Sequence, residues 1–113
     1  MKKKLFGLFV ASILSVTGCA AVHVTKTSMG FHEPTIPDKV EIRMTLPGRG
    51  FVELATVASS NWHLGQTAKM HNSMRAKCAP LGANAVVITA SGVVGEGLSA
   101  RMWTAGMAIR YTE

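Results

Sequence analysis

Three side chains that could bind a soft metal ion lie within about one helical turn of each other. They are Met70, His71 and Met74, at positions i, i+1 and i+4. Thioether sulfur and imidazole nitrogen are ligands that suit Cu(I). Methionines at helical spacing, however, more often fill a hydrophobic core. The spacing leaves both interpretations open and favours the core.

Cys78 is the other candidate for chemistry on the same predicted helix. The neighbouring Arg75 and Lys77 would lower the pKa of its thiol if the side chain were exposed, which would suit a redox role or a bridge to another chain. Seven residues separate Cys78 from His71, about 10.5 Å along a helix, so the two cannot bind one ion directly. Its place on the apolar side of the helix favours a small buried core residue.

Catalysis has little support in the sequence. Ser59, Ser60 and His63 supply hydroxyls and a base, but Ser59-Ser60-Asn61 stands just before a helical pattern and is typical of an N-cap. No two acidic residues are spaced to place paired carboxylates on one face. We therefore expect a protein that is not an enzyme.

A glycine-rich segment from residue 92 to residue 100 could contact a partner. Its distinctive residues are Gly92, Gly95, Glu96 and Gly97. The glycine spacing matches neither the P-loop nor the dinucleotide-binding fingerprint, and the segment joins two predicted strands rather than opening a helix. We expect a mobile hairpin loop that can adapt its backbone to a partner.

The elements that position these residues follow from the hydrophobic pattern. Apolar residues alternate with polar ones over 39–46, and a turn at 47–50 leads to a second strand over 51–58, which predicts a hairpin. A helix is expected over 64–81. Pro80 should distort its last turn, and Gly82 suits a position with positive φ.

Two further strands are expected after the helix. Residues 85–91 are apolar on both faces, and the strand over 101–111 places Trp103, Ala105, Met107, Ile109 and Tyr111 on one inner face. The order β-β-α-β-β, with a parallel crossover through the helix, predicts an α+β fold. It consists of a small four-stranded mixed sheet with one packed helix.

The N-terminal region has the pattern of an export signal. Three lysines at positions 2–4 precede twelve uncharged, mostly apolar residues at 5–16. A membrane-spanning helix needs about 20 apolar residues, so this run is too short. A basic segment followed by a short apolar one is the pattern of a secretory signal peptide.

The residues that follow make the signal more specific. Val16-Thr17-Gly18-Cys19 resembles the lipobox of bacterial lipoprotein precursors. The resemblance implies cleavage between Gly18 and Cys19 and a diacylglyceryl group on Cys19, with acylation of the new amino terminus. Apart from this covalent lipid we expect no cofactor. Because Ala20 is not aspartate, the resemblance also implies sorting to the inner leaflet of an outer membrane, facing the periplasm.

These observations divide the chain into three parts. Residues 1–18 form the signal peptide, 19–38 a lipidated flexible tether, and 39–113 the folded α/β domain. The tether has no regular period, although Val22-His23-Val24 could instead pair as an edge strand. From Cys19 onward nine basic and six acidic residues give a net charge of +3. The basic residues are scattered, which argues against binding to nucleic acid.

One further motif resembles known proteins. Leu81-Gly82-Ala83-Asn84-Ala85-Val86-Val87, with Gly106-Met107-Ala108-Ile109, is similar to envelope lipoproteins such as the sensor of the Rcs phosphorelay, and to the YbjQ-like family, long labelled heavy-metal-binding. The resemblance covers residues 51–111 and implies a fold: a helix stop, a tight turn and a buried strand. This chain keeps only Cys78 of the sensor's cysteines. It has Ala58-Ser59-Ser60 where YbjQ-like proteins carry Gly-Glu, so function is not implied.

We therefore expect a lipid-anchored cell-envelope protein that acts by contact with another envelope protein. The expected role is stress sensing or envelope maintenance, with the tether and the segment 92–97 as contact elements. The alternative is a periplasmic lipoprotein that binds Cu or Zn through Met70, His71 and Met74.

Overall fold

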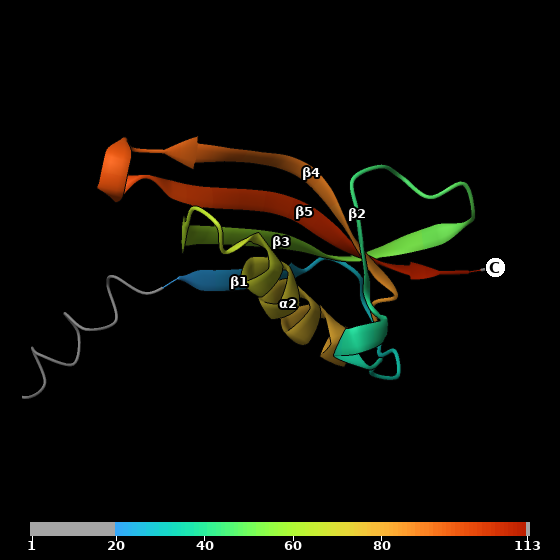
Figure 1. The fold of residues 1–113 in the computed structure, drawn as a ribbon. Coiled ribbons are helices and arrows are strands. Elements are labelled where there is room, and N and C mark those ends of the chain that lie inside the picture. Colours follow the sequence, from blue (N-terminus) through green and yellow to red (C-terminus); the bar gives the residue numbers. More distant parts are fainter. Residues whose placement is uncertain (1–19, 113) are drawn as a thin grey trace, which may run out of the picture.

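The computed structural model describes residues 20–112, so the predicted signal peptide and the lipidation site at Gly18 and Cys19 lie outside the described residues. One helix packs on one face of a five-stranded sheet (Figure 1). The strands are β1 (Ala21–Lys26), β2 (Glu41–Arg43), β3 (Phe51–His63), β4 (Ala85–Val94) and β5 (Arg101–Tyr111), and the helix is α2 (Thr67–Cys78). Three short 3₁₀ helices are η1 (Pro37–Lys39), η2 (Ala79–Leu81) and η3 (Gly97–Ser99).

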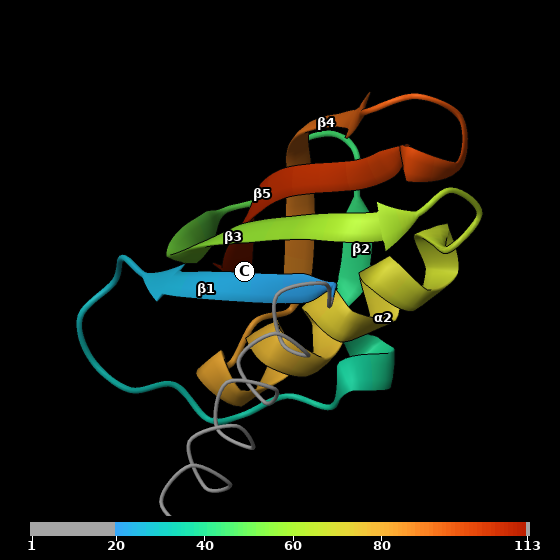
Figure 2. The same cartoon turned by 90° about the vertical axis from the view of Figure 1, so that its left-hand side faces the viewer.

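The strand order in the sheet is β1-β3-β5-β4-β2, with β5 in the centre. All neighbours are antiparallel except β4 and β2, which are parallel. The expected α+β class, mixed sheet and single packed helix are confirmed. The expected four strands in the order β-β-α-β-β are wrong, because a fifth strand is present. In addition, β5 is inserted between β3 and β4, the two strands that α2 connects (Figure 2).

The predicted hairpin between residues 39–46 and 51–58 is also wrong. Strand β2 does not pair with β3 but lies at the opposite edge, where Glu41 is the register partner of Ala85. The Glu41 amide donates to the Asn84 carbonyl at 3.0 Å, which fixes the start of this pairing. A period of two indicates which side chains are buried, but it does not identify the strand's partner.

The tether expected over residues 19–38 is wrong for the segment that forms β1. This strand pairs with β3, and its Val22 and Val24 side chains pack against the core, so the edge-strand alternative is confirmed. The connection that follows is also attached to the domain. The Thr35 amide donates to the Ala79 carbonyl at 2.8 Å, and the Thr35 hydroxyl donates to the Ala83 carbonyl.

Helix α2 is shorter than the expected range of 64–81, because β3 continues to His63 and includes Ser59-Ser60-Asn61. Its buried residues are Met70, Met74 and Cys78, at intervals of four. The prediction that Pro80 distorts the end of the helix is confirmed, since η2 follows α2 directly. Gly82 then adopts a left-handed conformation with φ 91°, as its position predicted.

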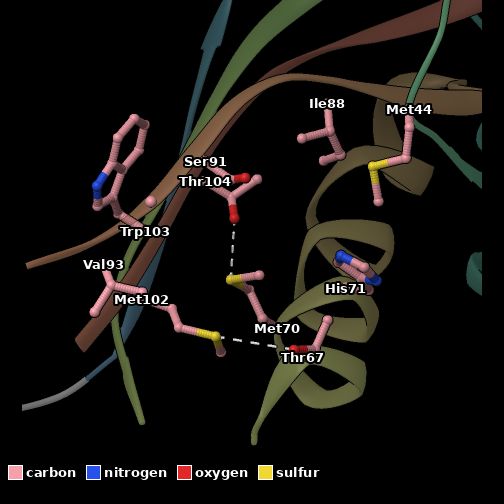
Figure 3. Close-up of a pocket in the computed structure, with 11 residues that line it drawn as sticks. Met44, Thr67, Met70, His71, Ile88, Ser91, Val93, Met102, Trp103 and Thr104 are labelled. Atoms are coloured by element: carbon pink, nitrogen blue, oxygen red, sulfur yellow. Dashed lines mark hydrogen bonds between the residues drawn. The ribbon is translucent and has the colours of Figure 1, made fainter. Parts of the chain in front are cut away.

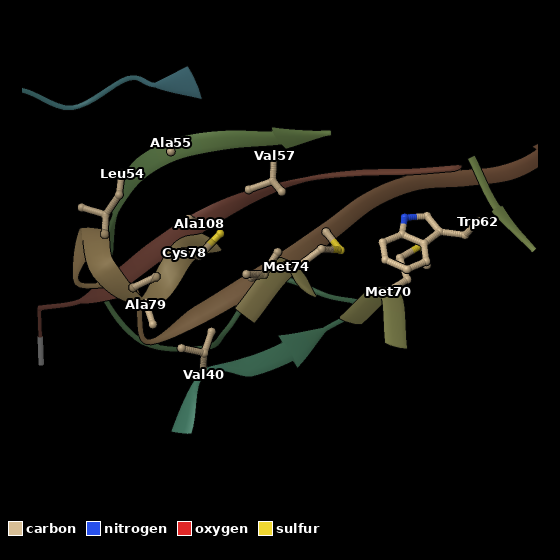
Figure 4. Close-up of a cluster of buried hydrophobic side chains, with 12 residues drawn as sticks. Val40, Leu54, Ala55, Val57, Trp62, Met70, Met74, Cys78, Ala79 and Ala108 are labelled. Atoms are coloured by element: carbon tan, nitrogen blue, oxygen red, sulfur yellow. The ribbon is translucent and has the colours of Figure 1, made fainter. Parts of the chain in front are cut away.

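The core lies between α2 and the sheet, where small residues of β5 make room for the helix. Ala108 is fully buried there, and Met74 and Cys78 fill the space above the strands (Figure 4). A second cluster on the other face contains Ala85, Val87 and Ile109, with Phe51, Met107 and Tyr111 packed around it. The inner face expected for β5 therefore lies on the side of the sheet that α2 does not cover.

Gly106 in β5 allows β4 to bend closely over the centre of the sheet. A Cβ atom at Gly106 would lie 2.3 Å from the Val87 carbonyl oxygen. A register shift between Ile88 and Ala90 marks a β-bulge in β4 just beyond this point. Bulges bend a strand and increase its twist, so the second half of β4 turns away from the direction that β2 follows.

We predict that Gly106→Ala lowers the free energy of unfolding by about 1–3 kcal/mol, because the added methyl group must displace the β4 backbone. The matched control is Gly48→Ala, where a Cβ atom meets nothing within 4 Å. Urea unfolding monitored by tryptophan fluorescence measures both variants. Equal midpoints for the two variants would contradict the packing constraint.

Candidate functional site

A cleft of about 240 Å³ lies between the first half of α2 and the strands β4 and β5 (Figure 3). We call it the β4 cleft. Its lining is mostly apolar and comes from four parts of the chain: the segment after β2, helix α2, strand β4 and strand β5. The lining residues are Met44, Thr67, Met70, His71, Ile88, Ser91, Gly92, Val93, Met102, Trp103 and Thr104.

The β4 cleft adjoins a strand edge that is open in the described part of the chain. Strand β2 pairs with β4 only at Ala85, Val86 and Val87. From Ile88 to Val94 the outer edge of β4 has no strand partner among residues 20–112. We call these seven residues the β4 edge. Such an edge presents unpaired backbone N–H and C=O groups.

Two methionine sulfurs in the β4 cleft accept hydrogen bonds from threonines. The Thr104 hydroxyl donates to the Met70 sulfur at 3.4 Å, and the Thr67 hydroxyl donates to the Met102 sulfur at 3.9 Å. These bonds orient two thioethers on the walls of the cleft (Figure 3). Met44 lies on the rim and is 64% exposed.

His71 is the titratable side chain of the β4 cleft. Partial burial lowers the pKa of its imidazole below the ordinary value of 6.5, and the nearby Arg75 guanidinium lowers it further. Arg75 is held by hydrogen bonds to the Val40 carbonyl at 2.9 Å and to the Asn72 side chain at 2.6 Å. At neutral pH the imidazole is therefore uncharged and carries both a donor and an acceptor nitrogen.

The predicted metal-binding triad is not assembled. Met70 and His71 line the β4 cleft, whereas Met74 is fully buried in the core beneath α2. The structure instead brings Met44 and Met102 to the cleft from distant parts of the chain. Sequence reasoning missed both, although seven methionines in 113 residues were a signal. Within residues 20–112 no group of three or more His, Cys, Asp or Glu residues could hold a metal ion.

The predicted contact loop is shorter than expected. Gly92 belongs to β4, where a Cβ atom would lie 2.8 Å from the Trp103 indole nitrogen, so it is not a loop residue. Gly95, Glu96 and Gly97 do lie in the connection between β4 and β5. The two glycines have φ values of 86° and 57°, which other residues rarely adopt.

Cys78 is a core residue, as its position on the helix predicted. It is unpaired and fully buried, and burial raises the pKa of its thiol to about 11. Ser59 is also buried and accepts a hydrogen bond from the Trp62 indole, while Ser60 and His63 are exposed. Because Ser59 and Ser60 are successive strand residues, they point to opposite faces of the sheet.

Comparison with known proteins adds information about the fold. No family model matches the chain, and no curated protein matches it. The crystal structure of a Francisella virulence factor, FvfA, in its orthorhombic form is similar to this chain with a TM-score of 0.56. The sequences are 14% identical, and the match covers 80% of this chain and 98% of FvfA. At this identity the likeness shows a shared fold.

We predict that acid lowers the stability of this protein partly through His71. Its folded-state pKa lies below 6.5, so the unfolded chain takes up the proton first, and the free energy of unfolding falls as the pH drops below 6.5. His71→Gln should lose less stability than the wild type between pH 7.5 and pH 5. The control is His63→Gln, which removes an exposed imidazole outside the β4 cleft and is measured by the same urea unfolding. Equal losses in all three proteins would contradict this role.

Proposed function

We propose that this chain is a lipid-anchored cell-envelope protein that acts by contact with another envelope protein, without catalysis. The contact is an extended segment of the partner that pairs with the β4 edge. One observation carries this proposal: the β4 edge, from Ile88 to Val94, runs directly beside the β4 cleft.

Strand addition uses both features together. Unpaired backbone groups of an edge strand give a partner its main-chain hydrogen bonds, and a pocket beside the edge selects alternate side chains. Ile88, Ser91 and Val93 of the β4 edge also line the β4 cleft. A bound strand would therefore place an apolar side chain between β4 and α2.

The lining of the β4 cleft indicates the chemistry of that side chain. Methionine side chains are flexible and polarizable, so they adapt to apolar groups of different shapes. No acidic residue lines the cleft in the described part of the chain, and the imidazole of His71 on its wall is uncharged at neutral pH. The partner segment should thus be extended, without proline in its paired residues, and should carry an aliphatic or aromatic residue at the cleft.

The anchor in this proposal is supported by the sequence. The lipobox pattern Val16-Thr17-Gly18-Cys19 follows a basic and then an apolar segment, and Ala20 is compatible with an outer-membrane destination. Within residues 20–112 no helix is long and apolar enough to cross a membrane. Two or three acyl chains on Cys19 would hold the domain at the periplasmic face of the outer membrane, where stress sensing or envelope maintenance would take place.

Site-specific photo-crosslinking tests the contact. We predict that the full chain with p-benzoylphenylalanine at Ser91 forms an adduct with one envelope protein in cells. The same group at Ser60, an exposed strand residue outside the β4 cleft, serves as the matched control. Mass spectrometry should locate the adduct in an extended segment, and a synthetic peptide of that segment should compete with it. Adducts of equal yield from both positions, or none from Ser91, would refute the contact.

A second candidate function is binding of a soft metal ion in the same cleft. The observation that favours it is the gathering of Met44, Met70, Met102 and the uncharged His71 around one cavity. Thioether and imidazole ligands suit Cu(I), and thioethers are not oxidised by this ion.

Thermal unfolding separates the two candidates. A metal-binding protein should gain melting temperature with Cu(I), and the gain should disappear in Met70→Leu/His71→Ala but persist in Met29→Leu. Met29 is 97% exposed and lies outside the cleft, so it controls for binding to surface methionines. A protein that acts by contact alone should show no Cu(I)-dependent shift in any of these variants.

A further inference from the structure

The start of β1 leaves almost no chain between the domain and the proposed lipid. Strand β1 begins at Ala21, two residues after Cys19. The inference that follows rests on the proposed lipid anchor at Cys19. With Ala20 as the whole connection, the end of the sheet where β1 begins must lie against the membrane surface.

The connection between β4 and β5 lies at this same end of the sheet. Ala21 is the register partner of Ser60, and β3 continues for three more residues to His63, which pairs with Arg101. Val94 pairs with Arg101 on the other side. Residues 95–100, which we call the hairpin tip, therefore project beyond the start of β1, and Figure 1 shows η3 and the start of β1 at the same end.

The hairpin tip carries one apolar side chain, Leu98, that no part of the described chain covers. Leu98 is 100% exposed, and the adjoining Val93 and Val94 are 56% and 59% exposed. Single exposed apolar residues are common on protein surfaces. Here Leu98 lies at the end of the domain that the proposed anchor holds at the lipid, and Val93 and Val94 lie on the two faces of the strand that leads to it.

The backbone of the hairpin tip is held in place by its own hydrogen bonds. The Ser99 hydroxyl and amide both donate to the Glu96 carbonyl, at 2.7 and 3.1 Å. The Arg101 guanidinium donates to the carbonyls of Leu98 and Ala100, at 3.0 and 2.9 Å. These bonds hold the backbone on both sides of Leu98 and place the Arg101 cation behind it.

We propose that the hairpin tip inserts Leu98 into the lipid surface that holds Cys19, so that the domain is attached at two points. Three strand spacings separate β1 from β4, about 14 Å, and both points therefore reach one leaflet. The Glu96 carboxylate limits the depth to the boundary between headgroups and acyl chains. Two attachments fix the rotation of the domain, which one lipidated residue cannot do.

The test uses the full lipidated chain in vesicles of phosphatidylethanolamine and phosphatidylglycerol. An environment-sensitive NBD label is attached to Leu98→Cys or to Met29→Cys. Met29 is 97% exposed and follows the other end of β1, so it is the matched control. Cys78 is buried, and the unsubstituted protein gives the background labelling.

We expect the label at position 98 to shift to shorter emission wavelengths and to be quenched several-fold more than the label at position 29 by nitroxide lipids. Flotation of the vesicles and the intact mass of the extracted protein report the anchor independently. A lipidated protein that floats, with both labels equally in water, would overturn the insertion and leave the anchor standing. That result is also expected if a protein, rather than lipid, covers the tip. A protein without acyl chains that fails to float would overturn both.

Discussion

The close approach of two backbones, at Gly106 of β5 and Val87 of β4, is the constraint on which the rest of the structure depends. No side chain fits between them, so β5 presents only small groups to the helix near its centre, and α2 can lie deep on the sheet with Met74 and Cys78 beneath it. The β-bulge just beyond this approach bends β4 away from β2. The bend leaves the second half of β4 without a partner in the described chain and opens the β4 cleft beside it. The β4 edge and the β4 cleft, which carry the proposed function, thus follow from how tightly the centre of the sheet is packed.

Both proposals for the β4 cleft draw on the same side chains. Thioethers that adapt to an apolar residue of a partner are also soft ligands, so the lining alone does not separate contact from metal binding. The open strand edge distinguishes the two proposals, because a metal ion does not require a row of backbone hydrogen-bonding groups beside its ligands. It is for this reason that the strand-addition proposal takes precedence. The Francisella protein of similar fold supports the architecture of this chain. The chemistry of the β4 cleft is inferred from this chain's own residues alone.

Local features of this fold could be predicted from the sequence, and long-range ones could not. Gly82 was placed correctly in a left-handed conformation, and β5 was found at residues 101–111, because both depend on a few adjacent residues. Strand partners depend on which edges meet in three dimensions, so the alternation around Ile42 identified a strand but assigned it to the wrong neighbour. The β4 cleft could be predicted only in part. Met70 and His71 are neighbours in sequence, whereas Met44 and Met102 join them from distant parts of the chain.

The reactivity of Cys78 reports how often α2 separates from the sheet. The thiol is fully buried beneath α2, so an alkylating reagent cannot reach the sulfur in the folded state. Its raised pKa also keeps the thiol protonated, and the protonated form is not the nucleophile. Modification must then proceed through rare open conformations, in the manner of amide hydrogen exchange. The rate at which Cys78 reacts is therefore set by the equilibrium between closed and open helix when closing is fast. The rate of Cys78 modification therefore measures how often α2 separates from the sheet. This measurement can be made on the protein at the membrane where it is proposed to work.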